Sequence, residues 1–244
     1  MRKTYSAEGI ERDVTIYAYW KEETKPYNFT YKKTESITIT SCSSNLATVV
    51  IPSFISGLPV DTIENISSHN CRSLTSVTIP DSVTSIGDYA FYGCDKLIEV
   101  YNQSTLTITA GSSSNGYVGC YAKNVYTSTF GESKLSTDSN GYIIYTDKED
   151  KILVSYVGHA TELTLPEDIT EIYRYAFSGC GNLTSVIIGD SVTSIGMYVF
   201  YGCNGIKEIY YSGTKEQWDK ILVDIGNTIS PTATIHYEYQ AQEE

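Results

Sequence analysis

Clusters of positive charge are what this 244-residue sequence most clearly lacks. It holds 17 Lys and Arg against 29 Asp and Glu, which gives a formal net charge of −12 at pH 7. The densest basic stretch is "YKKT" at residues 31–34. Because phosphate backbones and anionic lipids both attract clustered Lys and Arg, we expect neither nucleic acid nor an anionic membrane surface as a partner.

Long apolar runs are missing as well. No stretch of the sequence approaches the roughly 18 consecutive apolar residues of a membrane-spanning helix, so we expect no direct membrane insertion. The opening "MRKTYSAEGIERDV" starts with basic residues but has no apolar segment behind them, which argues against a signal peptide. An internal piece of a longer exported protein would have this character.

The patterns of common catalytic and metal sites are also missing. The three histidines, at 69, 159 and 236, show no metal-ligand spacing, and no C-x-x-C or G-x-S-x-G motif occurs. In "DSNGYIIYTDKED" (138–150), Gly141 stands at the fourth position and not at the sixth of a calcium-binding loop, which favours an Asn-Gly hairpin turn. We therefore expect no enzyme, no catalytic or metal-binding residues and no cofactor. An enzymatic site within residues 102–160 is the most remote alternative.

Repetition is what the sequence has instead. "SLTSVTIPDSVTSIGDYAFYGC" (73–94) recurs 109 residues later as "NLTSVIIGDSVTSIGMYVFYGC" (182–203). Leu74, Val77 and Ile79 have the L-x-x-L-x-L spacing of a leucine-rich repeat, which predicts a short strand with these three side chains inward. In "DYAFYGC", Ala90 and Phe91 share an apolar face with a Cys at 94, which predicts a short helical turn.

These units have to stack, because one alone cannot bury its apolar side chains. Further copies start at "NLATVVIP" (45–52), "KLIEVYN" (96–102), "ELTLPEDITEIYRYAFSGC" (162–180) and "GIKEIYYSGTKEQW" (205–218). The cysteines at 71 and 94, and those at 180 and 203, are each 23 residues apart, which favours thiols packed in register over disulfides. The predicted fold is a β-rich α/β solenoid of 23-residue units, each a short strand plus a short helical turn.

The middle of the chain departs from this period. We predict an irregular insertion at about 102–160, with a short helix around "GYVGCYAKNVY" (116–126) and a hairpin pairing 141–147 with 151–157. "TATIHYEY" (232–239) alternates like a strand and is expected to cap the open end. The predicted boundaries are a remnant of a preceding β-rich module or linker at 1–24, an N-terminal cap at 25–45, the solenoid at 46–239 and a tail at 240–244.

Residues 74–94 and 183–203 resemble the BspA-type leucine-rich repeats of bacterial surface proteins, whose units read roughly LTSVTIPxSVTSIGxxAFxGC. Residues 162–180 are similar to its second half, and the similarity extends over about 45–238. Separately, "GIERDVTIYAYW" (9–20) resembles the tail of an internalin-type B-repeat, which closes on TLYAxW. The resemblance implies an extracellular, cell-surface module that adheres to a host matrix protein, another bacterial surface protein or a glycan. We expect a monomer.

Recognition would fall on the outward positions of the strands or on the insertion, because solenoids bind through extended faces and function concentrates on loops. Tyr is enriched at binding hot spots, which favours Tyr101 and Tyr210 as anchors. The candidate ligand contacts are Ser76, Thr78, Ile98, Glu99, Tyr101, Glu162, Thr164, Ile187, Glu208 and Tyr210. The alternative is a passive spacer, in which the Ser and Thr residues only keep the strands soluble.

Overall fold

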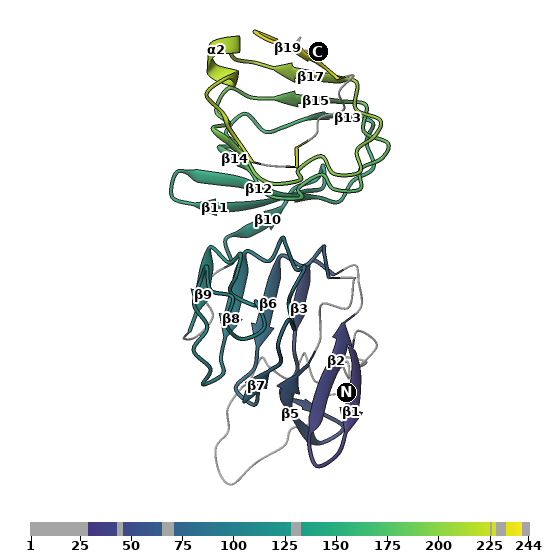
Figure 1. The fold of residues 1–244 in the computed structure, drawn as a ribbon, viewed down its shortest axis with the longest axis vertical. Helices are drawn as coiled ribbons and strands as arrows, with labels where there is room; N and C mark the ends of the chain where they lie inside the picture. The colour runs from purple at the N-terminus through teal and green to yellow at the C-terminus, as the bar shows by residue number, and fades with distance from the viewer. Residues whose placement is uncertain are drawn as a thin grey trace.

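The computed structural model describes residues 29–42, 46–64, 71–127, 133–224, 226–227 and 233–240. These residues form two stacks of short strands that lie end to end along the long axis of the molecule (Figure 1). We call strands β1 to β9 the N-terminal stack, and strands β11 to β19 with helix α2 the C-terminal stack. The proposed B-repeat tail at 9–20 lies outside the described residues and stays a prediction.

Each stack contains one parallel four-stranded sheet made from the repeat's first strands. In the N-terminal stack the order is β3 (Thr48–Val50), β6 (Ser76–Ile79), β8 (Glu99–Asn102) and β9 (Asn124–Tyr126). In the C-terminal stack it is β13 (Glu162–Thr164), β15 (Ser185–Ile188), β17 (Glu208–Tyr211) and β19 (Thr234–His236). We call the side of each sheet that carries residues such as Ser76 and Ser185, away from the core, its outer face.

A second sheet closes the other side of each stack. The N-terminal one contains β1 (Phe29–Lys33), β2 (Ile37–Cys42), β4 (Phe54–Ile55), β5 (Leu58–Ile63) and β7 (Ser85–Ile86). The C-terminal one runs β10 (Leu135–Thr137), β11 (Tyr142–Asp147), β12 (Asp150–Tyr156), β14 (Glu171–Ile172), β16 (Ser194–Ile195) and β18 (Leu222–Val223). Each coil alternates between a parallel sheet and a mixed sheet, in which β1/β2 and β11/β12 pair antiparallel, and these coils make the predicted solenoid.

The repeat's apolar positions fill the interiors as predicted. Leu74, Val77 and Ile79 are fully buried in the N-terminal core, and their counterparts Leu183 and Val186 are fully buried in the C-terminal core. Three of the repeat cysteines, Cys71, Cys94 and Cys203, are buried there as well, and Cys180 is half-buried. These positions confirm the prediction that the repeat's side chains serve stacking.

The segment after each first strand is a turn and not the helical turn that the sequence predicted. Tyr89 and Gly93 both have left-handed φ values, 60° and 82°, which interrupt a right-handed helix. The Phe91 amide between them donates to the Gly116 carbonyl of the next coil at 2.7 Å. An amide that donates to the neighbouring coil cannot also donate within a helix, so this segment forms a turn. Left-handed φ recurs at the equivalent residues Tyr175 and Tyr198.

Helix is scarce elsewhere too. Within the described residues the one α-helix is α2 (Lys215–Trp218), which Thr214 caps at its N-terminus. The short helix predicted around 116–126 is wrong: residues 114–121 form turns and residues 124–126 form β9. None of the helices among the described residues has the length and apolar character that crossing a bilayer demands.

The predicted insertion divides into two parts with different roles. Residues 102–126 continue the N-terminal stack, because β9 pairs in parallel with β8. Strands β11 and β12 form the predicted antiparallel hairpin. Strand β10 pairs with β11 across the predicted Asn-Gly turn, in which Gly141 has φ 89°. In Figure 1 this three-stranded unit lies at the end of the C-terminal stack that faces the N-terminal stack.

A separate apolar cluster joins the two stacks. It contains Ile98 from the N-terminal stack, and Ile143, Tyr145, Ile152, Val154 and Tyr173 from the hairpin and the coil beside it. The Tyr173 hydroxyl donates to the Tyr121 carbonyl at 2.6 Å, and the Arg174 guanidinium lies 4.0 Å from the centre of the Tyr121 ring. Apolar packing combined with directional polar contacts fixes one stack against the other.

Candidate functional site

The ten predicted contact residues fall into two sets of five, one on each stack. Ser76, Thr78, Ile98, Glu99 and Tyr101 belong to β6 and β8 or the residue preceding β8, and Glu162, Thr164, Ile187, Glu208 and Tyr210 belong to β13, β15 and β17. The sets correspond through the 109-residue repeat, which matches Ser76 with Ser185, Glu99 with Glu208 and Tyr101 with Tyr210. The structure gives these matched faces different surroundings.

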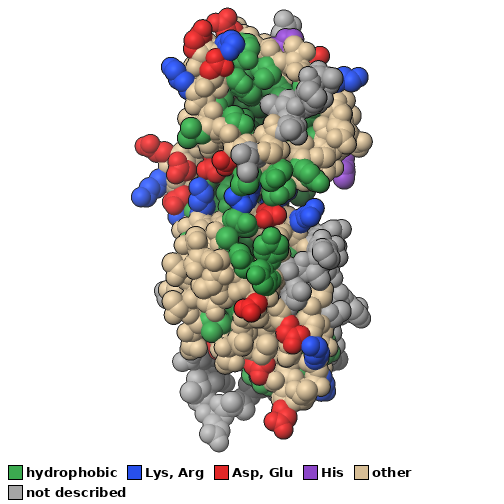
Figure 2. Space-filling model, in the orientation of Figure 1, with side chains coloured by type: hydrophobic (Ala, Val, Ile, Leu, Met, Phe, Trp, Pro, Cys, Tyr) green, Lys and Arg blue, Asp and Glu red, His purple; other side chains and the backbone are tan. Residues whose placement is uncertain are grey.

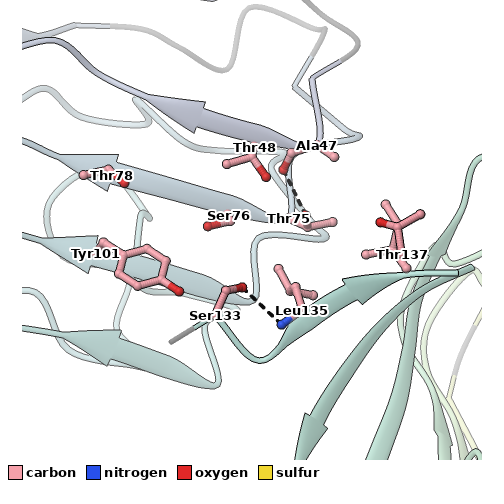
Figure 3. A pocket seen from close by; sticks show the side chains of 10 residues that line it. Ala47, Thr48, Thr75, Ser76, Thr78, Tyr101, Ser133, Leu135 and Thr137 are labelled. Atoms are coloured by element: carbon pink, nitrogen blue, oxygen red, sulfur yellow. Dashed lines mark hydrogen bonds between the residues drawn. The ribbon is translucent and has the colours of Figure 1, made fainter. Parts of the chain in front are cut away.

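A pocket of about 400 Å³ opens on the outer face of the N-terminal stack (Figure 3). The sheet side of its lining consists of Ala47, Thr48, Thr75, Ser76, Thr78 and Tyr101. The opposite side comes from the hairpin unit and consists of Ser133, Leu135, Thr137 and Ile143. We call residues 133–137 the β10 segment. A pocket thus forms where this segment crosses beside the repeat strands.

Glu99 anchors the β10 segment to the sheet. Its side chain is 0% exposed, and its carboxylate accepts hydrogen bonds from the Ser133 hydroxyl at 2.8 Å and the Lys134 amide at 2.8 Å. The Tyr101 hydroxyl donates to the same carboxylate at 3.1 Å. Hydrogen bonds to an ionised acceptor are stronger than neutral ones, so this network fixes the wall of the pocket.

Tyr101 contributes a protonated hydroxyl and a ring face. Burial raises its pKa to about 12, and the neighbouring Glu99 carboxylate adds to the rise. One face of its ring stacks on Tyr126 at a centroid distance of 4.9 Å. Tyr101 on β8 lies beside Thr78 on β6, because these two residues pair in the parallel sheet. The pocket therefore has an aromatic side wall.

Two hydroxyls on the floor of the pocket lack internal partners. Ser76 is 5% exposed and Thr78 is 9% exposed, and within the described residues neither hydroxyl makes a hydrogen bond. By contrast, the Thr75 hydroxyl donates to the Ala47 carbonyl at 2.9 Å. Both side chains line the pocket, so their hydroxyls are available to water or to a ligand.

Two of the predicted contacts are not on the surface. Ile98 was expected to face solvent, but it is 0% exposed and packs in the cluster that joins the stacks. Glu99 was expected to be accessible, but its carboxylate lies beneath the β10 segment. Both corrections have one cause: the hairpin unit returns to cover this part of the outer face.

The outer face of the C-terminal stack stays open. Glu162 and Thr164 are exposed, whereas Ile187, Glu208 and Tyr210 are half-buried. The His236 imidazole lies 2.6 Å from the Glu208 carboxylate and stacks on Tyr210 at 4.8 Å. Tyr239 contacts the same ring, at 4.6 Å. This arrangement is a partly exposed aromatic and ionic surface.

Lys96 is a second buried charged residue, and it lies at the junction of the two stacks. Its ammonium donates to the Ser155 hydroxyl at 2.9 Å, and it is 6% exposed. Burial lowers its pKa to about 8, although the nearby Cys180 and Cys203 oppose the shift. Burial likewise raises the pKa of the Cys203 thiol to about 12. This lysine lies away from the pocket lining and belongs to the junction.

Sequence reasoning missed the far wall of the pocket. Ser133, Leu135 and Thr137 were assigned only to an irregular insertion, and Ile143 only to a hairpin strand. The alternation in "SKLST" ahead of the Asn-Gly turn was the available signal for β10. That pattern predicts a strand, but it does not predict which sheet face the strand approaches.

Charges of both signs lie near the junction, where one ion pair, Lys123 with Glu171, joins the two stacks. Lys123 and Glu171, Lys134 and Asp147, and Lys151 and Asp168 form ion pairs. On the face drawn in Figure 2, Lys and Arg side chains lie among Asp and Glu near the middle of the molecule. Among the described residues, His, Cys, Asp and Glu make no group of three or more that would suit a metal ion.

Parallel strands stacked on a 23-residue repeat define a leucine-rich-repeat solenoid. Residues 41–118 and 155–221 match the family described as the BspA type leucine rich repeat region, in six copies. Because these matches take in more than half of the chain, the protein belongs to the BspA-type leucine-rich repeat family. Comparison with curated proteins gave no match.

Comparison with solved structures found several matches at low identity and low TM-score. A leucine-rich repeat protein from T. pallidum is 23% identical, with a TM-score of 0.27, over 75% of this chain and 69% of its own. A leucine-rich cell surface protein from Faecalibacterium prausnitzii A2-165 is 16% identical, with a TM-score of 0.30, over 82% and 97%. The pneumococcal vaccine antigen PcpA is 14% identical, with a TM-score of 0.33, over 75% and 70%.

Proposed function

We propose that this chain is a non-enzymatic binding module of a bacterial surface protein, and that its ligand enters the pocket beside the β10 segment. The observation that carries the proposal is the pocket itself, about 400 Å³ in volume and walled by two separate parts of the chain. Small-molecule sites typically measure about 300–1,000 Å³, and they form where structural units meet. The rigid Glu99 network keeps this site open without a ligand.

Membership of the BspA-type family supports placement of the module outside the cell. The F. prausnitzii protein is described as a cell surface protein and PcpA as a vaccine antigen. These descriptions concern those two proteins and not this chain. The partners that we propose for this chain are a host matrix protein, another bacterial surface protein or a glycan. The chain itself acts as a monomer, because the pocket is complete within one copy.

The chemistry of the pocket favours binding over catalysis. Its lining consists of Ser, Thr, Tyr, Ala, Leu and Ile, and none of the ten lining residues is a His, Cys, Lys, Asp or Glu. A general acid or base needs a pKa near the working pH, whereas Tyr101 keeps its proton until a pH of about 12. A site with hydroxyls and apolar contacts alone orients a ligand without transforming it.

A matched pair of substitutions tests this function. Thr48 and Glu162 are exposed and occupy equivalent positions on the first strand of each sheet. Thr48→Trp places an indole at the rim of the pocket, and Glu162→Trp places one on the open face. Purified wild type and both variants are applied to immobilised matrix proteins, bacterial cells and a glycan array, with circular dichroism to check folding.

We expect Thr48→Trp to reduce retention at least tenfold and Glu162→Trp to change it less than twofold. If only Glu162→Trp loses retention, the binding surface is the outer face of the C-terminal stack and not the pocket. Folded wild-type protein that is retained by no surface in the panel would overturn the proposal and favour the passive spacer.

A further inference from the structure

We infer that the pocket takes a neutral, hydroxyl-rich ligand, namely one sugar ring of an uncharged glycan. The inference rests on the proposed function and specifies the ligand class for the same pocket. Three properties of the lining carry it: the absence of charge, unpaired hydroxyls on the floor, and apolar surfaces on the walls.

Charge is the first property. None of the lining side chains is ionised, so a charged ligand would lose its hydration without gaining a counter-ion. The nearest buried ionisable group is Glu99, which Ser133 and Tyr101 separate from the cavity while they hydrogen-bond to it. A carboxylate next to the wall repels anions, and the whole chain carries −12. Sugar acids, sulfated sugars and phosphorylated ligands are therefore disfavoured.

Hydroxyl chemistry is the second property. Ser76 and Thr78 are nearly buried, and their oxygens have no partner within the described residues. A hydroxyl both donates and accepts, so its natural counterpart is another hydroxyl, which does the same. Thr48 on β3 and Thr137 on β10 add two more hydroxyls to the lining (Figure 3). A sugar ring presents hydroxyls around its edge and can meet several of these groups at once.

The apolar surfaces are the third property. Leu135 and Ile143 form one wall, and the Tyr101 ring forms another. Tyr126 covers one face of that ring, and the other side is directed along the sheet toward Thr78. The C–H faces of a sugar ring pack on aromatic and aliphatic surfaces while its hydroxyls bond at the edge.

Size agrees with a single ring. A volume of 400 Å³ corresponds to roughly a dozen water molecules at about 30 Å³ each. A pyranose with its substituents fills about half of this space, and bridging waters or part of a second ring take the rest. A globular protein surface could contact only the rim of such a cavity, whereas the end of a glycan enters it.

The experiment is calorimetric titration of the full chain with methyl glycosides of neutral hexoses and N-acetylhexosamines, each beside its uronic acid counterpart. We expect at least one neutral glycoside to bind, with its uronic acid at least tenfold weaker. Ser76→Ala and Thr78→Val each remove one hydroxyl, and we expect each to weaken binding about three- to tenfold. The matched controls Ser185→Ala and Thr164→Val should leave affinity within twofold.

Three results would overturn the inference: no neutral glycoside binds, the uronic acids bind equally well, or the controls weaken binding as much as the pocket variants. These results are distinguishable from failure of the proposed function. If Thr48→Trp abolishes retention on a protein surface while every glycoside fails, the binding role stands and the sugar is wrong.

Discussion

The outer faces of the two stacks begin from nearly the same residues and end as different surfaces. Glu99 and Glu208 are equivalent in the repeat, and so are Tyr101 and Tyr210. Glu99 is fully buried and bonds to the β10 segment, whereas Glu208 is half-exposed and pairs with His236. Each tyrosine stacks on an aromatic ring of the following strand, Tyr126 in one case and His236 in the other.

The difference comes from the chain that returns over one face and not the other. Residues 133–137 cross beside β8, while the corresponding part of β17 faces solvent. A repeated strand therefore does not carry a function by itself; the neighbouring segment determines whether its outward residues form a pocket, a buried junction or an open surface. Substitutions at matched positions of the two outer faces test this difference.

The largest expected effect is at Glu99. Glu99→Ala removes the acceptor for the Ser133 hydroxyl and the Lys134 amide, and we expect a loss of about 2–4 kcal/mol in unfolding free energy. Glu208→Ala removes only an exposed ion pair and should cost less than about 1 kcal/mol. Urea unfolding of both variants measures the contrast. Equal losses would contradict the anchoring role of Glu99.

The second largest effect on unfolding free energy is expected at Ile98. Ile98→Ala leaves a cavity in the cluster between the stacks, and we expect a cost of about 2–4 kcal/mol. Its repeat counterpart, Lys207, is exposed, and Lys207→Ala should change stability by less than about 0.5 kcal/mol. The same unfolding measurement applies. A neutral Ile98→Ala would mean that the stacks do not pack through this cluster.

Lys96 should destabilise the junction at neutral pH. Its folded pKa of about 8 lies below the usual 10.5, so between these values the unfolded chain binds more protons and unfolding free energy rises with pH. Below pH 8 the destabilisation that comes from burying the charged Lys96 ammonium is present in full. We therefore expect Lys96→Met to stabilise the protein by about 1–3 kcal/mol at pH 7, and by less at pH 9.

Thermal unfolding of wild type and Lys96→Met at both pH values tests this sign. The difference between the two proteins cancels the titration of groups that do not interact with Lys96. The repeat counterpart of Lys96 is Gly205, so the C-terminal stack has no equivalent charge. If Lys96→Met stabilises the protein more at pH 9 than at pH 7, the lowered folded pKa of Lys96 is contradicted.

The smallest expected contrast is between the two tyrosine hydroxyls. Tyr101→Phe loses one hydrogen bond to the Glu99 carboxylate and should cost about 1 kcal/mol. Tyr210→Phe should change stability by less than about 0.3 kcal/mol, since that half-exposed ring contributes mainly by stacking on His236 and Tyr239. Spectrophotometric titration adds a second check, because Tyr101 should ionise only near pH 12.

Much of the solenoid was predictable because its code is local. The spacing of Leu74, Val77 and Ile79 predicted a strand with an inward face, and these residues are fully buried. The runs "GYIIYTD" and "KILVSYV" on either side of "KED" predicted the hairpin of β11 and β12. The helical turn was wrong because the Phe91 amide bonds to the next coil, and an apolar pattern alone does not show that preference.

The pocket was only half predictable. Ser76, Thr78 and Tyr101 follow from the outward positions of their strands, and all three line it. The burial of Ile98 and Glu99 depends on a segment about 35 residues farther along the chain, and no local periodicity encodes that contact. Long-range covering of a repeat face is set by tertiary packing, so it emerges only from the structure.

Methyl NMR of the Thr, Leu and Ile side chains during titration with the neutral methyl glycosides distinguishes the pocket from the open face. We expect the methyl signals of Thr78, Leu135 and Ile143 to shift with added glycoside, and those of Thr164 and Ile187 on the open face to stay in place. Shifts on the open face, or none at the pocket methyls at millimolar glycoside, would contradict binding in the pocket.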